Sequence, residues 1–136
     1  MLKSAAMFRQ SGRVSVSIGH LEKPDQFDEY MNLTTGFEND FGFALEEADV
    51  REATVEPSPK PIPQLVDGFS GCDSFAENVA KPAEAAGIKK ATTMLICYSF
   101  EFDPLRAKAN PNAPLQFLGS FPFSESSAYT ANADGN

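Results

Sequence analysis

The chain has 136 residues, a formal net charge of −8 at pH 7 and a hydrophobic content of 42%. This hydrophobic content is sufficient for one folded domain with a single core, and it argues against a disordered chain. The negative charge disfavours binding to nucleic acid or to an anionic membrane surface, so a basic protein is the expected partner.

The acidic residues are concentrated in one part of the chain. Residues 22–56 contain eleven acidic residues against Lys23 and Arg51, whereas residues 1–21 contain three basic residues and no acidic one. Such a block indicates a negative patch, although an ordinary solvated face would explain the same count.

The first half of the chain predicts two strands and two helical segments. Residues 13–21, "RVSVSIGHL", alternate apolar and polar residues and predict a half-buried strand. Residues 23–33 predict a helix that has Pro24 in its first turn. Residues 34–43 predict a short helix or irregular segment held by aromatic rings, and residues 49–55 predict a short strand.

The middle of the chain predicts a connector followed by helices. Prolines alternate through residues 57–63, which favours a stiff extended connector. Residues 62–69 have apolar side chains at helical spacing. Residues 72–87 continue as helix, in which Pro82 should break or restart the helix and Gly87 should end it.

Two apolar strands are predicted near the end of the chain. Residues 93–103 place their even-numbered apolar residues on one face, while the opposite face ends in Glu101 and Asp103. Residues 115–123 form the second strand, and the simplest topology is an antiparallel hairpin with a long tip. We expect four phenylalanines to be buried on these adjacent strands: Phe100, Phe102, Phe117 and Phe121.

These elements predict an α+β fold: a small, largely antiparallel sheet with helices packed on one face. Residues 1–136 are expected to form one domain with its core at about residues 13–123, and residues 124–136 are expected to form a flexible polar tail. Cys72 and Cys97 lack the spacing of a metal site, and the sequence has neither a secretory h-region nor an apolar stretch of membrane-spanning length. A cytoplasmic protein with reduced thiols is expected.

The carboxylates Glu101 and Asp103 admit several functions. Together with His20, the single histidine, they could serve a small enzyme or a metal-binding domain. They could equally be part of a docking surface, or solvated charges of a domain whose acidity serves only solubility. No hydrolase, phosphate-binding, zinc-protease or calcium-loop motif occurs, so we expect no catalysis, cofactor or bound metal.

Several segments together resemble one protein family. They are "VSVSIGHL" with "DQFDEYM", "FENDFGFALEEADVREATV", "IPQLVDGFSGCDSF", and the pair "LICYSFEFDP" and "LQFLGSFPF". In this combination the chain resembles the immunity protein 22 family of bacterial polymorphic toxin systems. It departs from the family pattern at Gly19-His20, where an aromatic residue is expected, and at Gly71-Cys72.

The resemblance implies a cytoplasmic antidote that binds and neutralises a cognate toxin without catalysis. Charge complementarity then implies a toxin with a basic surface, and a nuclease is the class that this charge suggests. The toxin-binding acids are predicted by physical reasoning alone: Glu38, Asp40, Glu46, Glu47, Asp49, Glu101 and Asp103.

Overall fold

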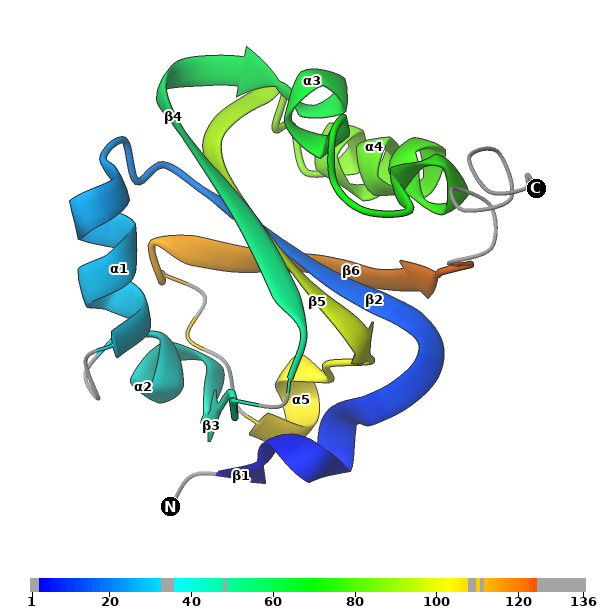
Figure 1. Cartoon of the computed structure of the whole chain (residues 1–136). Coiled ribbons are helices and arrows are strands. Elements are labelled where there is room, and N and C mark those ends of the chain that lie inside the picture. Colours follow the sequence, from blue (N-terminus) through cyan, green and yellow to red (C-terminus); the bar gives the residue numbers. More distant parts are fainter. Residues whose placement is uncertain (1–2, 33–35, 48, 108–109, 111, 125–136) are drawn as a thin grey trace.

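The computed structural model describes residues 3–32, 36–47, 49–107, 110 and 112–124, and Figure 1 shows their arrangement. Its centre is a four-stranded antiparallel sheet in the order β4-β5-β2-β6. These strands are β2 (Arg9–Gly19), β4 (Arg51–Pro61), β5 (Lys90–Phe100) and β6 (Leu115–Pro122). The helices are η1 (Ala5–Phe8), α1 (Pro24–Asn32), α2 (Phe37–Phe41), α3 (Ile62–Val66), η2 (Cys72–Ser74), α4 (Ala76–Ala85) and α5 (Pro104–Ala107). A separate parallel pair joins β1 (Lys3–Ser4) to β3 (Phe43–Ala44).

The predicted α+β class and the antiparallel sheet are confirmed, but the helices lie on both faces of the sheet. Figure 1 shows α3 and α4 on one side of the sheet and α1 and α2 on the other. The α3/α4 side encloses a largely aliphatic core that includes Val16, Val66 and Ile96. The α1/α2 side encloses an aromatic core, and this core also buries Ala5 and Phe8 of η1, which precede the predicted core boundary.

The first predicted strand, now β2, is buried on both faces rather than half-buried. Val14 and Val16 are fully buried on one face, and Ser15 and Ser17 on the other face are each only 5% exposed. Because β2 lies between two other strands and between two helical layers, its serine face meets protein instead of water. The alternation correctly predicted a strand, but it could not show the second layer.

The predicted hairpin of the last two strands is wrong. Val14 of β2 pairs with Tyr98 of β5 on one side and with Phe121 of β6 on the other. The strands β5 and β6 are therefore parallel to each other and separated by β2, because the long connection between them crosses that strand. Of the four phenylalanines, three are buried and Phe117 is half-buried.

The alternation of β5 is interrupted at Ser99, whose φ is 56°. The even-numbered residues before this point, such as Tyr98, face the α3/α4 core, whereas Phe100 and Phe102 face the aromatic core. The predicted common face of all the even-numbered residues is therefore wrong. Ser15 supports the interruption, since its Oγ bonds the Phe100 carbonyl at 3.0 Å and accepts the Phe102 N–H at 2.9 Å.

Two predictions for the middle of the chain need correction. The helix α4 continues through Pro82 instead of breaking there, although it ends as predicted before Gly87, which has a φ of 76°. Because proline has no N–H, α4 lacks one of its hydrogen bonds at this position. The proline connector is not separate from the preceding short strand, since β4 extends to Pro61 with a register shift between Val55 and Lys60.

The predicted polar tail, residues 124–136, lies outside the described residues except for Ser124. Within the described ranges, none of the helices has the length and apolar character needed to cross a membrane.

Candidate protein-binding surface

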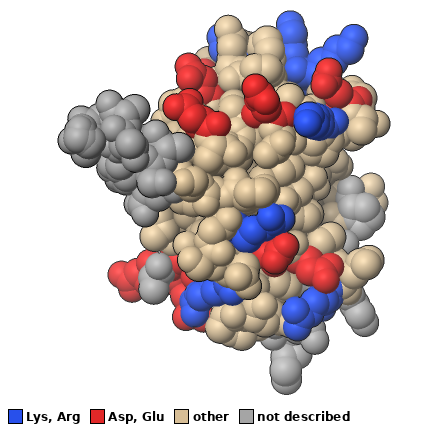
Figure 2. Space-filling view, turned by 90° about the vertical axis from the view of Figure 1, so that its right-hand side faces the viewer, with Lys and Arg blue, Asp and Glu red and all other residues tan. Residues whose placement is uncertain are grey.

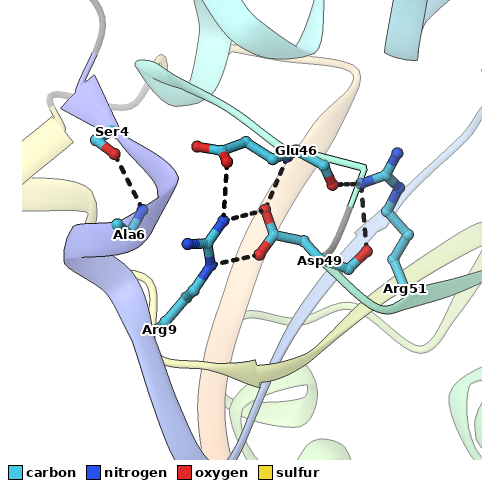
Figure 3. Close-up of polar contacts among 6 residues, drawn as sticks. All are labelled: Ser4, Ala6, Arg9, Glu46, Asp49 and Arg51. Atoms are coloured by element: carbon cyan, nitrogen blue, oxygen red, sulfur yellow. Dashed lines mark hydrogen bonds and ion pairs between the residues drawn. The ribbon is translucent and has the colours of Figure 1, made fainter.

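Two of the predicted toxin-binding acids, Glu46 and Asp49, form ion pairs with Arg9. The Arg9 guanidinium donates two hydrogen bonds to the Asp49 carboxylate, from Nε to Oδ1 at 2.7 Å and from Nη2 to Oδ2 at 3.2 Å (Figure 3). The same Nη2 lies 3.3 Å from a carboxylate oxygen of Glu46. The hydrogen bond from Arg9 lowers the pKa of Asp49, so this carboxylate is ionised at neutral pH.

The loop that carries these acids is further fixed by its own contacts (Figure 3). Arg51 donates from Nη1 to the backbone carbonyls of Glu46 at 3.0 Å and Asp49 at 3.4 Å, and the Glu46 N–H donates to Asp49 Oδ2 at 2.7 Å. Nearby, the Ser4 hydroxyl accepts the Ala6 N–H at the start of η1. Arg9 therefore pairs with the carboxylates of Glu46 and Asp49 while Arg51 holds the backbone of the loop, and the Arg9 contacts join the N-terminal segment to the loop before β4.

Glu101 and Asp103 follow the end of β5 and lie in a hollow of mixed charge. Glu101 is 3.5 Å from Arg13 Nη2, and Asp103 Oδ1 accepts the Leu105 N–H at 3.0 Å, which starts α5. The hollow has a volume of about 440 Å³ and is also lined by Arg9 and Arg106. The pair therefore lies among arginines, in a hollow of mixed charge and not in a uniformly negative one.

Asp40 is a structural residue. Its side chain is 7% exposed overall, and its two carboxylate oxygens accept the Tyr30 hydroxyl at 2.9 Å and the Asn110 amide at 3.0 Å. Burial, together with the Asp40 carboxylate, raises the pKa of Tyr30. Of the remaining predicted acids, Glu47 is exposed and Glu38 is half-buried.

The alternative site does not assemble around His20. This residue follows β2 beyond Gly19, whereas Glu101 donates its N–H to the Phe8 carbonyl at the opposite end of the same strand. Within the part of the chain that is described, no group of three or more His, Cys, Asp or Glu side chains is placed to hold a metal ion.

The structure instead reveals two acidic hollows on either side of β4. The α1-side hollow, of about 430 Å³, has Asp28, Glu38 and Glu52 among its lining residues, although the Glu52 carboxylate itself bonds Ser70 and Tyr98 on the α3/α4 side. Its basic lining residue is Arg51, which is engaged with the loop carbonyls described above. Its lining also includes three half-buried apolar side chains: Phe27, Met31 and Leu45.

The α3-side hollow is larger, at about 750 Å³, and lies between β4 and α3. Its charged lining residues are Glu52, Glu56 and Asp67 against Lys60. Glu52 and Ala53 line both hollows, so the strand β4 forms the ridge between them.

Glu52 is held in its ionised form at this ridge. Burial by itself would raise its pKa, but hydrogen bonds from Ser70 and Tyr98 outweigh that effect, and the pKa of Glu52 is lowered. Its Oε1 accepts the Ser70 N–H at 2.9 Å and the Tyr98 hydroxyl at 3.0 Å. The prediction missed Glu52 and Asp28, although both belong to the acidic block of residues 22–56, because charge counting does not identify which acids lack a cation.

The face shown in Figure 2 is of mixed charge. Figure 2 shows acidic and basic side chains interspersed over the face that it presents. Across the described residues, the ion pairs join Arg9 to Glu46 and Asp49, and Arg13 to Glu101, and none involves an acid of the two hollows. The hollows beside β4 are therefore the better candidate for binding a basic partner.

Comparison with known proteins adds no relative. No family model matches the chain, and neither a curated protein nor a solved structure does.

Proposed function

We propose that this chain is an immunity protein that binds and neutralises a basic toxin protein in the cytoplasm, without catalysis. The observation that carries the proposal is the α1-side hollow, where Asp28 and Glu38 adjoin the half-buried side chains of Phe27, Met31 and Leu45. The resemblance of the segments to the immunity protein 22 family supplies the class of function.

An acidic and apolar hollow supports binding in two ways. Its carboxylates attract a basic surface at long range and accelerate the encounter, which favours an antidote that must act before damage occurs. Its apolar side chains offer burial to an anchoring residue of the partner, and such central anchors supply most of the binding energy in protein interfaces. A toxin that cleaves nucleic acid has a basic active-site cleft, and the surface around such a cleft is complementary in charge to this hollow.

The proposed surface differs from the predicted one in its residues. Glu38 is retained, and Asp28 and Glu52 are added. Asp40 is excluded because it is buried, and Glu46 and Asp49 are excluded because Arg9 balances them.

The test is co-expression with the protein encoded beside this gene. The wild-type chain should restore growth of cells that produce that protein, and the purified pair should form a complex that weakens with salt. A variant combining Asp28→Lys and Glu38→Lys should raise the dissociation constant by at least about tenfold, which is about 1.4 kcal/mol.

The matched control combines Glu77→Lys and Glu84→Lys, two exposed acids of α4. It makes the same change in net charge on a different element, so it should weaken binding much less. An equal loss of affinity in both double variants would mean that overall charge, and not the α1-side hollow, determines binding. Absence of any complex or growth rescue would contradict the immunity function.

A further inference from the structure

The outer edge of β4 is open over its first half. The strand lies at one end of the sheet order, and the Tyr98 N–H of β5 donates to the Val50 carbonyl at 2.9 Å. Backbone groups alternate in direction along an antiparallel strand, so Arg51, Ala53 and Val55 direct their N–H and C=O groups away from β5. Among the described residues, no hydrogen bond to these outward groups is seen.

The second half of the same edge is closed to pairing. The Ile62 N–H donates to the Lys89 carbonyl at 3.3 Å, so the preceding Pro61 lies at an outward position. Pro57, Pro59 and Pro61 have no N–H to donate, and prolines of this kind protect sheet edges. Pairing along this edge is thereby restricted to residues 50–56.

The two acidic hollows flank this open segment. Successive side chains of a strand point to opposite faces of its sheet, so a strand added to β4 would direct its side chains alternately to the two sides. On one side they would meet Glu56 and Asp67 of the α3-side hollow, and on the other Asp28 and Glu38 of the α1-side hollow. Basic side chains on both faces of an added strand would therefore lie near carboxylates.

We propose that an extended segment of a partner protein, with lysine or arginine directed to both faces, adds as a fifth strand to the open edge of β4. Its backbone would bond Arg51, Ala53 and Val55, and its basic side chains would enter the two hollows. Strand addition of this kind obtains affinity from main-chain hydrogen bonds and specificity from the side-chain pockets. The identity of the partner as a toxin rests on the proposed function above, whereas the pairing edge does not depend on it.

The test uses a capped six-residue peptide of threonine and valine with lysine at two adjacent positions, so that one lysine faces each side. Amide hydrogen exchange of the whole protein is followed by NMR as the peptide is added at low salt. The amides of Arg51, Ala53 and Val55 should exchange at least about tenfold more slowly at saturation. An analogue with glutamate in place of lysine, and one with a methylated backbone, should give no protection.

Two variants of Ala53 separate strand pairing from simple charge attraction. Ala53→Pro removes an outward N–H without removing a bond to β5, so the fold should persist while peptide affinity falls at least about tenfold. Ala53→Val keeps the N–H and should bind like the wild type. Failure of the peptide to bind, or equal binding by both variants, would overturn the pairing.

The outcomes also separate this inference from the proposed function. Peptide pairing without growth rescue would support strand pairing at the edge of β4 and contradict the toxin-neutralising function. If the Ala53→Pro variant still rescues growth, the toxin-neutralising function would be supported and its dependence on strand pairing at β4 contradicted.

Discussion

Ser15→Ala should destabilise the protein more than its size suggests. The Ser15 hydroxyl lies in the middle of the sheet, bonds the Phe100 carbonyl at 3.0 Å and accepts the Phe102 N–H at 2.9 Å, and it is 2.9 Å from the Ser120 hydroxyl. It thereby satisfies backbone groups that the irregularity at Ser99 removes from the regular strand ladder. Alanine fits the same space but offers no partner to these groups.

The magnitude follows from the two backbone groups that lose this partner. A buried polar group left without its hydrogen bond costs about 1–3 kcal/mol. Two such groups, partly relieved by local relaxation, give an expected loss of about 2–4 kcal/mol in the free energy of unfolding. Ser17→Ala is the matched control, because Ser17 is equally buried on the same face of β2 and has no side-chain hydrogen bond within the described residues.

Urea denaturation of both variants measures the difference. The midpoint should fall for Ser15→Ala with little change in the slope, whereas Ser17→Ala should remain within about 0.5 kcal/mol of the wild type. Equal midpoints for the two variants would refute the role of Ser15 in supporting the interruption of β5.

Three further outcomes are expected. Phe100→Ala should cost about 3–5 kcal/mol in urea denaturation, since Phe100 is 1% exposed and packs on the rings of the aromatic core; a loss below 1.5 kcal/mol would contradict that packing. The pKa of Asp49 is lowered in the folded protein, so its ionised form stabilises the fold above a pH of about 4, and this stabilisation is lost as the pH falls below that value. The destabilising effect of Asp49→Asn should therefore shrink on acidification, and a pH-independent effect would argue against the Arg9 contact. Burial raises the pKa of Cys97 to about 12, so a thiol reagent should modify the half-buried Cys72 first and Cys97 only on unfolding.

The sequence predicted the local elements well because their signals are local. Apolar spacing at residues 62–69 correctly predicted a helix and its buried residues, although α3 ends at Val66 and Phe69 packs from the turn that follows it. Gly87 correctly marked the end of α4. The same reasoning placed strands at β2 and β5. Each of these inferences depends on residues within a few positions of one another.

The order of the strands was not predictable in this way. Two apolar strands with a connection between them favour a hairpin, and nothing in their own residues indicates that β2 inserts between them. The flip of Phe100 to the other face depends on Ser99, an ordinary strand residue by composition that adopts a positive φ in this fold. Both features are decided by tertiary packing, which overrides the local pattern.

The contacts of the predicted site residues were not predictable for a related reason. Counting placed Asp49 in an acidic block, but its partner Arg9 is 40 residues away in the sequence. Three basic residues in an N-terminal segment without acids are the signal that could have indicated such pairing. An acidic run becomes a negative surface only where its carboxylates lack an ion-pair partner, and among the described residues the acids of the two hollows beside β4 have none.

The charge beside β4 also bears on what this edge can bind. An unpaired strand edge is a template for any other strand, including the same strand of a second copy. Here the prolines close half of the edge, and the open half is flanked by Glu52, Glu56 and Asp67 on one side and Asp28 and Glu38 on the other. Two copies that paired edge to edge would bring these carboxylates together, and like charges placed opposite each other are destabilising. The carboxylates therefore oppose self-association and favour a basic strand, so the same charges that would attract the partner also protect the edge until the partner arrives.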